Sequence, residues 1–320
     1  MRLATYVDPL KGNEARFGIV SGDNIVDVVA AADRLHRAVP AISVKIALTS
    51  GEHTLAALKE LVTAAERAKL LRPISGVKFL PPIPDPSKFF CVGKNNRKHR
   101  EELAANKMLT EIPNEPTGFI KLISTMTGDG DEVAKPADIT ELDYEPELCY
   151  VVGKRAHGVK KADAMAYISG FTLMNDVSAR EIQKREVASG SRFWTAKNMP
   201  GFAPVGPYIL TMDEAADTDN LWVTCDVNGK QRLRSNTGDY LYKISDVLEH
   251  FSRYVVFEPG DLIAMGAPSG VAVGQPNAAE LYLQPGDDMV ISFEGLMSLR
   301  TKIVAARIGE QPSTSLLPKR

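Results

Sequence analysis

Residues 142–153 read Leu-Asp-Tyr-Glu-Pro-Glu-Leu-Cys-Tyr-Val-Val-Gly. Two glutamates separated by one residue lead directly into an apolar strand, and the rest of the chain is organised around this stretch. Side chains of an extended chain point alternately to opposite faces, so Glu145 and Glu147 share one face and Asp143 lies behind them on it. Neighbouring carboxylates repel each other unless water or a cation separates them. The stretch therefore indicates either a divalent metal site or the solvated face of a strand end.

A third acid, Asp176, lies where an apolar strand at 171–175 meets a helix expected at 179–186. With Glu145 and Glu147 it would give three oxygen ligands and leave about three positions of a six-coordinate shell for water and substrate, as hard cations such as Mg²⁺ prefer. Asp is also a favoured residue at the N-cap of a helix. The spacing alone fits both roles.

Two other segments hold side chains suited to acid–base chemistry. His99 and Glu102 are three residues apart in a basic segment that reads as the start of a helix, where this spacing makes them neighbours. The carboxylate would hold the imidazole as a general base, although a solvated helix or a basic patch for phosphate explains the same residues. Lys197, in an aromatic segment before a loop, either meets a substrate carboxylate or enolate or is simply solvated.

Most of the chain reads as short strands broken by Gly, Pro, Asn and Asp, which predicts a β-rich α+β fold. Strands are expected at 119–123, 171–175, 205–210, 221–229, 261–266 and 288–293, and short helices at 162–168, 179–186 and 244–251. Four prolines lie between Pro81 and Pro86 and mark a domain boundary. We therefore expect a small N-terminal α/β module at 1–80, a catalytic domain at 81–308 and a flexible tail at 309–320.

Composition narrows the class of partner. The chain has 38 basic and 40 acidic residues and a net charge of −2, so no general attraction to nucleic acid or to an anionic membrane is expected. Its three cysteines are far apart, which suits free thiols in a reducing compartment. We expect a cytoplasmic protein whose partner is a small molecule or a second subunit.

The chain resembles the fumarylacetoacetate hydrolase family over residues 83–305. The segments that carry the resemblance are Cys91–Asn95 with His99 and Glu102, Asp143–Leu148, Asn175–Arg180 with Gln183, Lys197, Ser235–Thr237, and Pro259–Ile263 through Pro268–Val271. This ordered set is more specific than any one motif, and it favours the metal site over a solvated strand. The resemblance implies a mixed-sheet β-roll for the catalytic domain and a homodimer.

The resemblance also assigns the site. It makes Glu145, Glu147 and Asp176 the ligands of Mg²⁺ or Mn²⁺, with Ca²⁺ as a further candidate, and it leaves Asp143 behind them. His99 and Glu102 match the dyad of a mobile lid. The remaining matches are Lys197 as a catalytic residue and Gln183, Thr237 and Arg180 as substrate-binding residues.

The lid segment departs from the family pattern. After Gly93 the family usually shows Asn-Tyr and then small or acidic residues before the histidine, whereas this chain has Asn96 in place of the aromatic residue, followed by Arg97 and Lys98. A second change is Ala267, where threonine is more usual. Both changes fall near the expected substrate and bear on specificity.

The activity implied by the resemblance is a divalent-metal-dependent hydrolase that cleaves a carbon–carbon bond in an acylpyruvate-like 1,3-diketo acid, as in aromatic catabolism. The 2-oxo acid end would chelate the metal, His99 with Glu102 would activate water, and Lys197 would help to stabilise the enolate. Oxaloacetate-type decarboxylation and 2-hydroxydienoate isomerisation or hydration use the same enolate. An inactive metal-binding relative, or an interaction module that docks acidic partners through Lys94–Arg100, is the alternative from another class.

Overall fold

The computed structural model describes residues 1–105, 114–191, 193–214 and 217–306. The flexible tail predicted at 309–320 lies outside these residues. No helix within the described ranges combines the length and the apolar character that a membrane span requires.

The architecture rests on two large sheets. The 12-stranded sheet has the order β4 (Arg72–Pro73), β3 (Asn24–Asp27), β2 (Ala15–Ser21), β1 (Arg2–Val7), β14 (Ala203–Thr211), β12 (Ile168–Asn175), β11 (Pro146–Val152), β17 (Leu262–Ala264), β6 (Phe89–Gly93) and β7 (Thr117–Lys121), with β5 (Lys78–Phe79) on β1 and β8 (Met126–Thr127) on β14. The 5-stranded sheet has the order β16 (Lys230–Asn236), β15 (Trp222–Val227), β18 (Asp288–Phe293), β19 (Met297–Ala305) and β9 (Glu132–Lys135). A separate pair joins β10 (Leu142–Asp143) and β13 (Ser178–Ala179).

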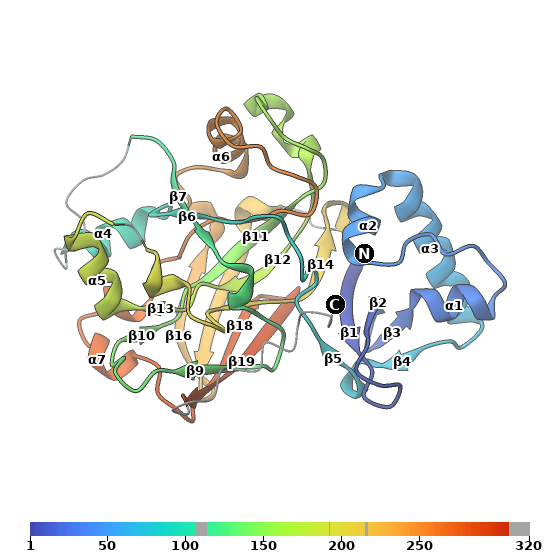
Figure 1. Ribbon diagram of the computed structural model, residues 1–320, viewed down its shortest axis with the longest axis horizontal. Coiled ribbons are helices and arrows are strands. Elements are labelled where there is room, and N and C mark those ends of the chain that lie inside the picture. Colours follow the sequence, from blue (N-terminus) through green and yellow to red (C-terminus); the bar gives the residue numbers. More distant parts are fainter. Residues whose placement is uncertain (106–113, 192, 215–216, 307–320) are drawn as a thin grey trace.

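Helices lie around the sheets (Figure 1). The α-helices are α1 (Val28–Arg34), α2 (Val44–Thr49), α3 (Glu52–Arg67), α4 (Arg97–Ala105), α5 (Arg180–Ala188), α6 (Ile244–Phe251) and α7 (Ala278–Leu281). The 3₁₀ helices are η1 (Ile74–Gly76), η2 (Ile123–Thr125), η3 (Lys161–Tyr167), η4 (Thr195–Lys197), η5 (Met212–Glu214), η6 (Thr218–Asn220), η7 (Thr237–Asp239) and η8 (Ala272–Gly274).

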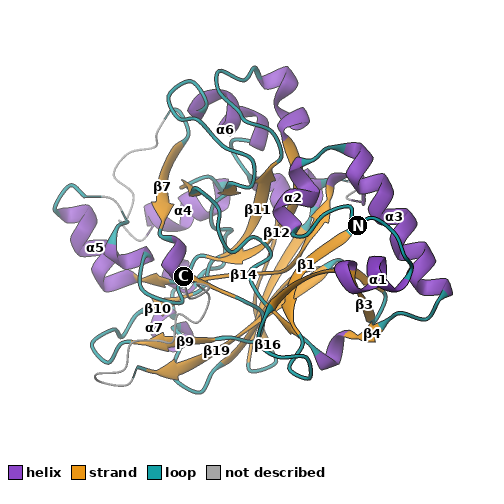
Figure 2. Ribbon diagram, turned by 45° about the vertical axis from the view of Figure 1, so that its right-hand side comes forward, coloured by secondary structure: helices purple, strands orange, loops and turns teal. Residues whose placement is uncertain are grey.

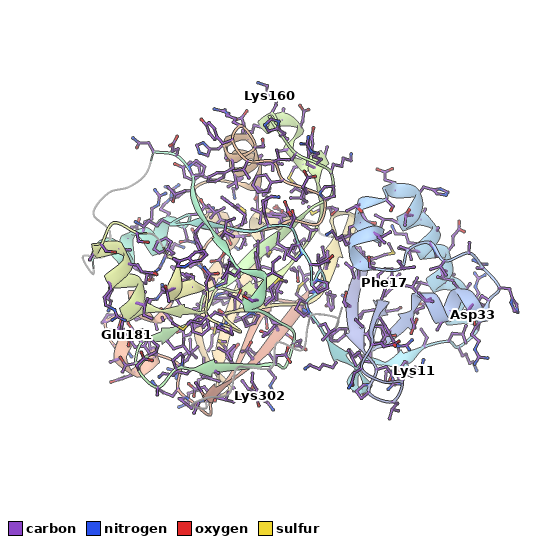
Figure 3. All side chains as sticks on the ribbon, viewed as in Figure 1. Lys11, Phe17, Asp33, Lys160, Glu181 and Lys302 are labelled. Carbon is purple, nitrogen blue, oxygen red and sulfur yellow. The ribbon has the colours of Figure 1, made fainter. Side chains whose placement is uncertain are left out.

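The N-terminal strands and helices form the blue part of Figure 1 and extend the large sheet. β1 pairs antiparallel with β14, with Arg2 opposite Leu210 and Leu3 opposite Ile209. Phe17 is buried in this part, whereas Lys11 and Asp33 lie at its outside (Figure 3). Because the backbone hydrogen bonds continue from one part into the other, the predicted module shares its sheet with the catalytic part, and the boundary at residue 80 stays a prediction.

The two large sheets pack through apolar side chains. Figure 2 shows β11, β12, β14 and β1 side by side, with β19 and β9 below them. Phe171 on β12 and Phe293 on β18 are both buried, and their ring centroids lie 6.1 Å apart in an edge-to-face arrangement with an interplanar angle of 68°. This contact joins the large sheet to the smaller one and forms part of the common core.

The fold class predicted from sequence is confirmed: mixed sheets with few helices make a β-rich α+β fold. The helix expected at 244–251 and the strand at 288–293 have the predicted bounds. The helix expected at 162–168 is the 3₁₀ helix η3. The strand β19 was missed, although its buried and exposed residues alternate, because its exposed positions include the charged Arg300 and Lys302, and lysine is depleted in strands.

Phe171→Ala should lower the free energy of unfolding by about 3–5 kcal/mol, because it removes a buried ring and leaves a cavity between the sheets. Urea denaturation followed by circular dichroism measures the loss. Leu10→Ala is the control, since Leu10 is 85% exposed and its truncation should change stability by less than about 0.5 kcal/mol. Equal stability of the two variants would contradict the packing described here.

Candidate metal centre and active site

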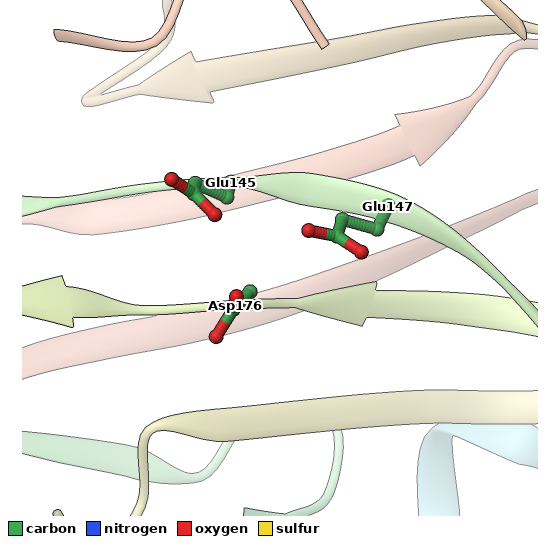
Figure 4. A group of neighbouring side chains, drawn as sticks. All are labelled: Glu145, Glu147 and Asp176. Carbon is green, nitrogen blue, oxygen red and sulfur yellow. The ribbon is translucent and has the colours of Figure 1, made fainter. Parts of the chain in front are cut away.

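Three buried carboxylates converge where β11 begins and β12 ends. Glu145, Glu147 and Asp176 each offer an oxygen atom, and these atoms lie within 4.8 Å of one another (Figure 4). The strand register explains the convergence, since Pro146 lies opposite Asn175 and the Asp176 N–H donates to the Glu145 carbonyl at 2.9 Å. The three predicted ligands are therefore together in space, as a hard divalent cation requires.

Lys197, at the end of η4, lies among these carboxylates. Its Nζ atom is 2.6 Å from Glu145 Oε2 and 2.8 Å from Asp176 Oδ2, and it donates to Ser178 Oγ at 2.6 Å. Burial alone would lower the pKa of Lys197, but the charges of Asp176 and Glu145 outweigh it and raise the pKa. Lys197 is thus a buried, protonated cation that contacts two of the three predicted metal ligands.

Arg180, the first residue of α5, supplies a second buried cation. Its Nη2 atom is 2.5 Å from Glu145 Oε1 and 2.8 Å from Asp143 Oδ2. Its Nη1 atom donates to Gln183 Oε1 at 2.9 Å. Arg180 and Gln183 were predicted to bind substrate, and the structure places both at the edge of the carboxylate cluster, where Arg180 pairs with the acids. Their contact with substrate stays a prediction.

Asp143 supports the cluster from behind, in agreement with its position outside the predicted ligand set. Its carboxylate accepts hydrogen bonds from the N–H groups of Ala272 and Val273 at 2.9 and 3.0 Å, and it receives Arg180 Nε at 2.8 Å. These bonds use both oxygens of Asp143. It therefore fixes the guanidinium of Arg180 and ties η8 to the site.

Lys121 is a site residue that sequence reasoning missed. It ends β7, is only 1% exposed, and its Nζ atom lies 2.6 Å from Asp176 Oδ1 and 2.5 Å from the Lys197 carbonyl oxygen. The signal in the sequence was weak: a lysine between Ile120 and Leu122 in a predicted strand. A charged residue inside an apolar strand points to a buried partner, and here the partner is the third predicted metal ligand.

The two glutamates differ in electrostatics although they share a face. Burial alone would raise the pKa of Glu145, but Lys197 and Arg180 outweigh it and lower the pKa to about 2. Burial, together with the charges of Asp176 and Glu145, raises the pKa of Glu147 well above its usual range. Glu147 accepts one hydrogen bond from the Gly266 N–H at 2.8 Å. A cation beside Glu147 would relieve the repulsion, so the oxygen donors fit a divalent metal ion.

The predicted dyad is assembled on α4. His99 is buried, and its Nδ1 atom lies 3.3 Å from Glu102 Oε2. Glu102 also accepts the Gly270 N–H at 3.0 Å and Gln275 Nε2 at 3.3 Å. Next to it Gly274 has no side chain, and a Cβ there would lie 2.7 Å from Glu102 Oε2. With Nδ1 directed at the carboxylate, Nε2 of His99 is left to act as a base.

His99 lies near Glu145, since a positive charge on its imidazole would be among the causes, after Lys197 and Arg180, that lower the pKa of Glu145. Thr237, predicted near a substrate carboxylate, is buried, and its hydroxyl donates to the Thr218 carbonyl at 2.9 Å and accepts from the Leu221 N–H at 2.8 Å. Thr237 therefore joins η7 to η6. The catalytic role of the dyad and the substrate contact of Thr237 stay predictions.

The family now follows from comparison with known proteins. Residues 88–304 match the family model described as fumarylacetoacetate (FAA) hydrolase C-terminal. The chain therefore belongs to the fumarylacetoacetate hydrolase family. This confirms the resemblance inferred from the ordered motifs.

Family members with different reactions are similar to this chain. The human protein named oxaloacetate tautomerase FAHD2A, mitochondrial, is 37% identical over 257 residues, which cover 80% of this chain and 78% of that protein. The structure of fumarylacetoacetate hydrolase from Exiguobacterium antarcticum matches with a TM-score of 0.75 and 28% identity over 96% of this chain and 100% of that one. A 5-carboxymethyl-2-hydroxymuconate delta-isomerase from Mycobacterium smegmatis matches with a TM-score of 0.70 and 26% identity over the same shares.

The chain is thus an enzyme of the fumarylacetoacetate hydrolase family, whose members include tautomerases, isomerases and hydrolases. Its buried Glu-Glu-Asp cluster can hold a divalent metal ion. Because the similar proteins catalyse different reactions on a shared fold, family membership alone does not fix the reaction.

Glu147→Gln should weaken Mn²⁺ binding by at least about tenfold, because it replaces an anionic ligand by a neutral amide of the same shape. Isothermal titration calorimetry with Mn²⁺ measures the change. Glu294→Gln is the matched control, since Glu294 is exposed and pairs with Arg234 on the surface. Unchanged Mn²⁺ affinity in the Glu147 variant would place the metal elsewhere.

Proposed function

We propose that this protein is a divalent-metal-dependent enzyme that interconverts the keto and enol forms of a 2-oxo acid, with oxaloacetate as the favoured substrate. The observation that carries the proposal is the buried carboxylate cluster of Glu145, Glu147 and Asp176 with the His99–Glu102 pair near it. The similarity to a protein named oxaloacetate tautomerase supports the choice of substrate.

The charge of the site supports an anionic substrate. Four carboxylates and three cations are buried together, namely Asp143, Glu145, Glu147, Asp176, Lys121, Arg180 and Lys197. With all of them ionised the group carries one net negative charge, and a bound divalent cation reverses that sign. A carboxylate of the substrate then balances the charge, as burial of ions requires.

The residues of the chain divide the work of proton transfer. A divalent cation held by the three acids would act as a Lewis acid on the keto oxygen of the substrate. His99 Nε2 takes the proton from the carbon next to the keto group and delivers it to the enolate oxygen; in the reverse direction it takes the enol proton and delivers it to the carbon. Glu102 holds the tautomer of His99, and Lys197 keeps a positive charge beside the site where negative charge develops on oxygen.

The second candidate is hydrolysis of a carbon–carbon bond in an acylpyruvate, as the resemblance implied. The same His99–Glu102 pair can remove a proton from water, and the fold matches that of a fumarylacetoacetate hydrolase. Oxaloacetate decarboxylation and 2-hydroxydienoate isomerisation share the enolate. The proposal includes Mg²⁺ or Mn²⁺ as the metal, with Ca²⁺ as the further candidate. It also includes a homodimer and a cytoplasmic location.

Oxaloacetate, fumarylpyruvate and acetylpyruvate should separate the candidates when each is assayed with Mg²⁺, with Mn²⁺ and with a chelator. We expect rapid loss of the ultraviolet absorbance of enol-oxaloacetate without release of pyruvate, and no activity with chelator. Cleavage of the acylpyruvates at a higher kcat/KM would favour the hydrolase. Turnover of none of them would contradict both candidates and favour a binding module.

His99→Ala should lower kcat by about 10²- to 10⁴-fold, because it removes the general base. Mn²⁺ affinity should stay the same, since His99 is not among the three carboxylate ligands. Stopped-flow absorbance for turnover and calorimetry for Mn²⁺ measure the two quantities. His157→Ala, at an exposed histidine, is the matched control, and equal kcat in the two variants would rule out the role of His99.

A further inference from the structure

Two adjacent asparagines precede α4, and both are fully buried with 0% exposure. Asn95 is satisfied: its Nδ2 donates to the carbonyls of Tyr242 and Met265 at 3.0 and 2.9 Å, and its Oδ1 accepts the Tyr242 N–H at 2.9 Å. Asn96 is not. Its Oδ1 accepts the His99 N–H at 3.0 Å, but its Nδ2 is buried without a hydrogen-bond partner.

The unpaired amide is a feature that needs a reason. A buried donor without an acceptor costs about 1–3 kcal/mol, so such groups are rare in folded proteins. Serine, threonine or aspartate would also accept the His99 N–H at the start of the helix, without leaving an N–H group unpaired. Asn96 therefore does more than cap α4: its second group is kept for a partner that is not part of the chain.

The surroundings of Asn96 identify the partner. Asn96 and His99 are three residues apart and share one face of the first helical turn. The main chain of Asn96 also pairs with that of Tyr240. The ring of Tyr240 is buried, which raises its pKa most, and it lies close enough to Glu147 for the carboxylate charge to raise the pKa further. Asn96 thus joins the helix that carries the proposed base to a segment whose ring lies near Glu147.

We propose that Asn96 determines substrate specificity, and that its Nδ2 donates a hydrogen bond to a carboxylate carried by the carbon atom that exchanges its proton with His99. This inference rests on the proposed function and narrows the substrate class to 2-oxo acids with a second carboxylate next to that carbon. A neutral donor suits the position. An acid there would repel the second carboxylate, and a buried cation would need an opposite charge of the protein beside it even without substrate.

Two non-reacting ligands isolate this contact. Malate and lactate are 2-hydroxy acids that differ only by the second carboxylate, so their affinities can be compared by calorimetry on protein saturated with Mn²⁺. We expect wild-type protein to bind malate more tightly than lactate. Asn96→Ser keeps an acceptor for the His99 N–H, so it should weaken malate binding by about tenfold and leave lactate binding unchanged. Asn96→Asp adds a negative charge that repels the second carboxylate, so it should weaken malate binding by up to about 100-fold.

The outcomes separate this inference from the proposed function. If the variants weaken malate and lactate binding equally, Asn96 only positions α4. The proposed contact would be overturned if the variants bind malate as tightly as the wild type, or if the wild type does not prefer malate to lactate. Loss of the malate preference in both variants supports it even if oxaloacetate is not turned over, in which case the tautomerase proposal alone fails. With oxaloacetate, the Ser variant should raise KM more than it lowers kcat.

Discussion

The site depends on the pairing of buried charges around Glu145. One oxygen of this carboxylate contacts Arg180 and the other contacts Lys197. Removing a charge from water costs several kcal/mol unless an opposite charge and hydrogen bonds replace the water. The cations are fixed in turn, since Arg180 is held by Asp143 and Lys197 by Asp176 and Ser178. The loss of any one member therefore leaves a buried partner with one opposite charge fewer.

Backbone pairing places these charges before any side chain does. β11 and β12 run antiparallel with Glu147 opposite Met174, and β10 pairs with β13 immediately beyond them. Both pairs leave their acids at the same end, so the carboxylates meet at the junction of two small pieces of sheet. The apolar residues that follow Glu147 in β11 are all buried, and they keep that junction rigid against the core.

Sequence patterns predicted the parts of the site that lie close together along the chain. The alternation of a strand placed Glu145 and Glu147 on one face, and the spacing of a helix placed His99 next to Glu102. Contacts between distant residues were beyond this reasoning. Lys121 and Asp176 are 55 residues apart and Glu102 and Gly270 are 168 apart, and only the sheet order brings them together. The same limit hid the contact of Asn96 with the segment at Tyr240.

The difference between Glu145 and Glu147 is the step that links this network to chemistry. Glu145 is ionised because two cations hold its pKa low, whereas Glu147 has a raised pKa because it is buried beside two other acids. One carboxylate is therefore already balanced by the protein, and the other is balanced only when a cation arrives from outside. Since that cation also reverses the net charge of the site, metal binding and the affinity for an anionic substrate are coupled through the same carboxylate.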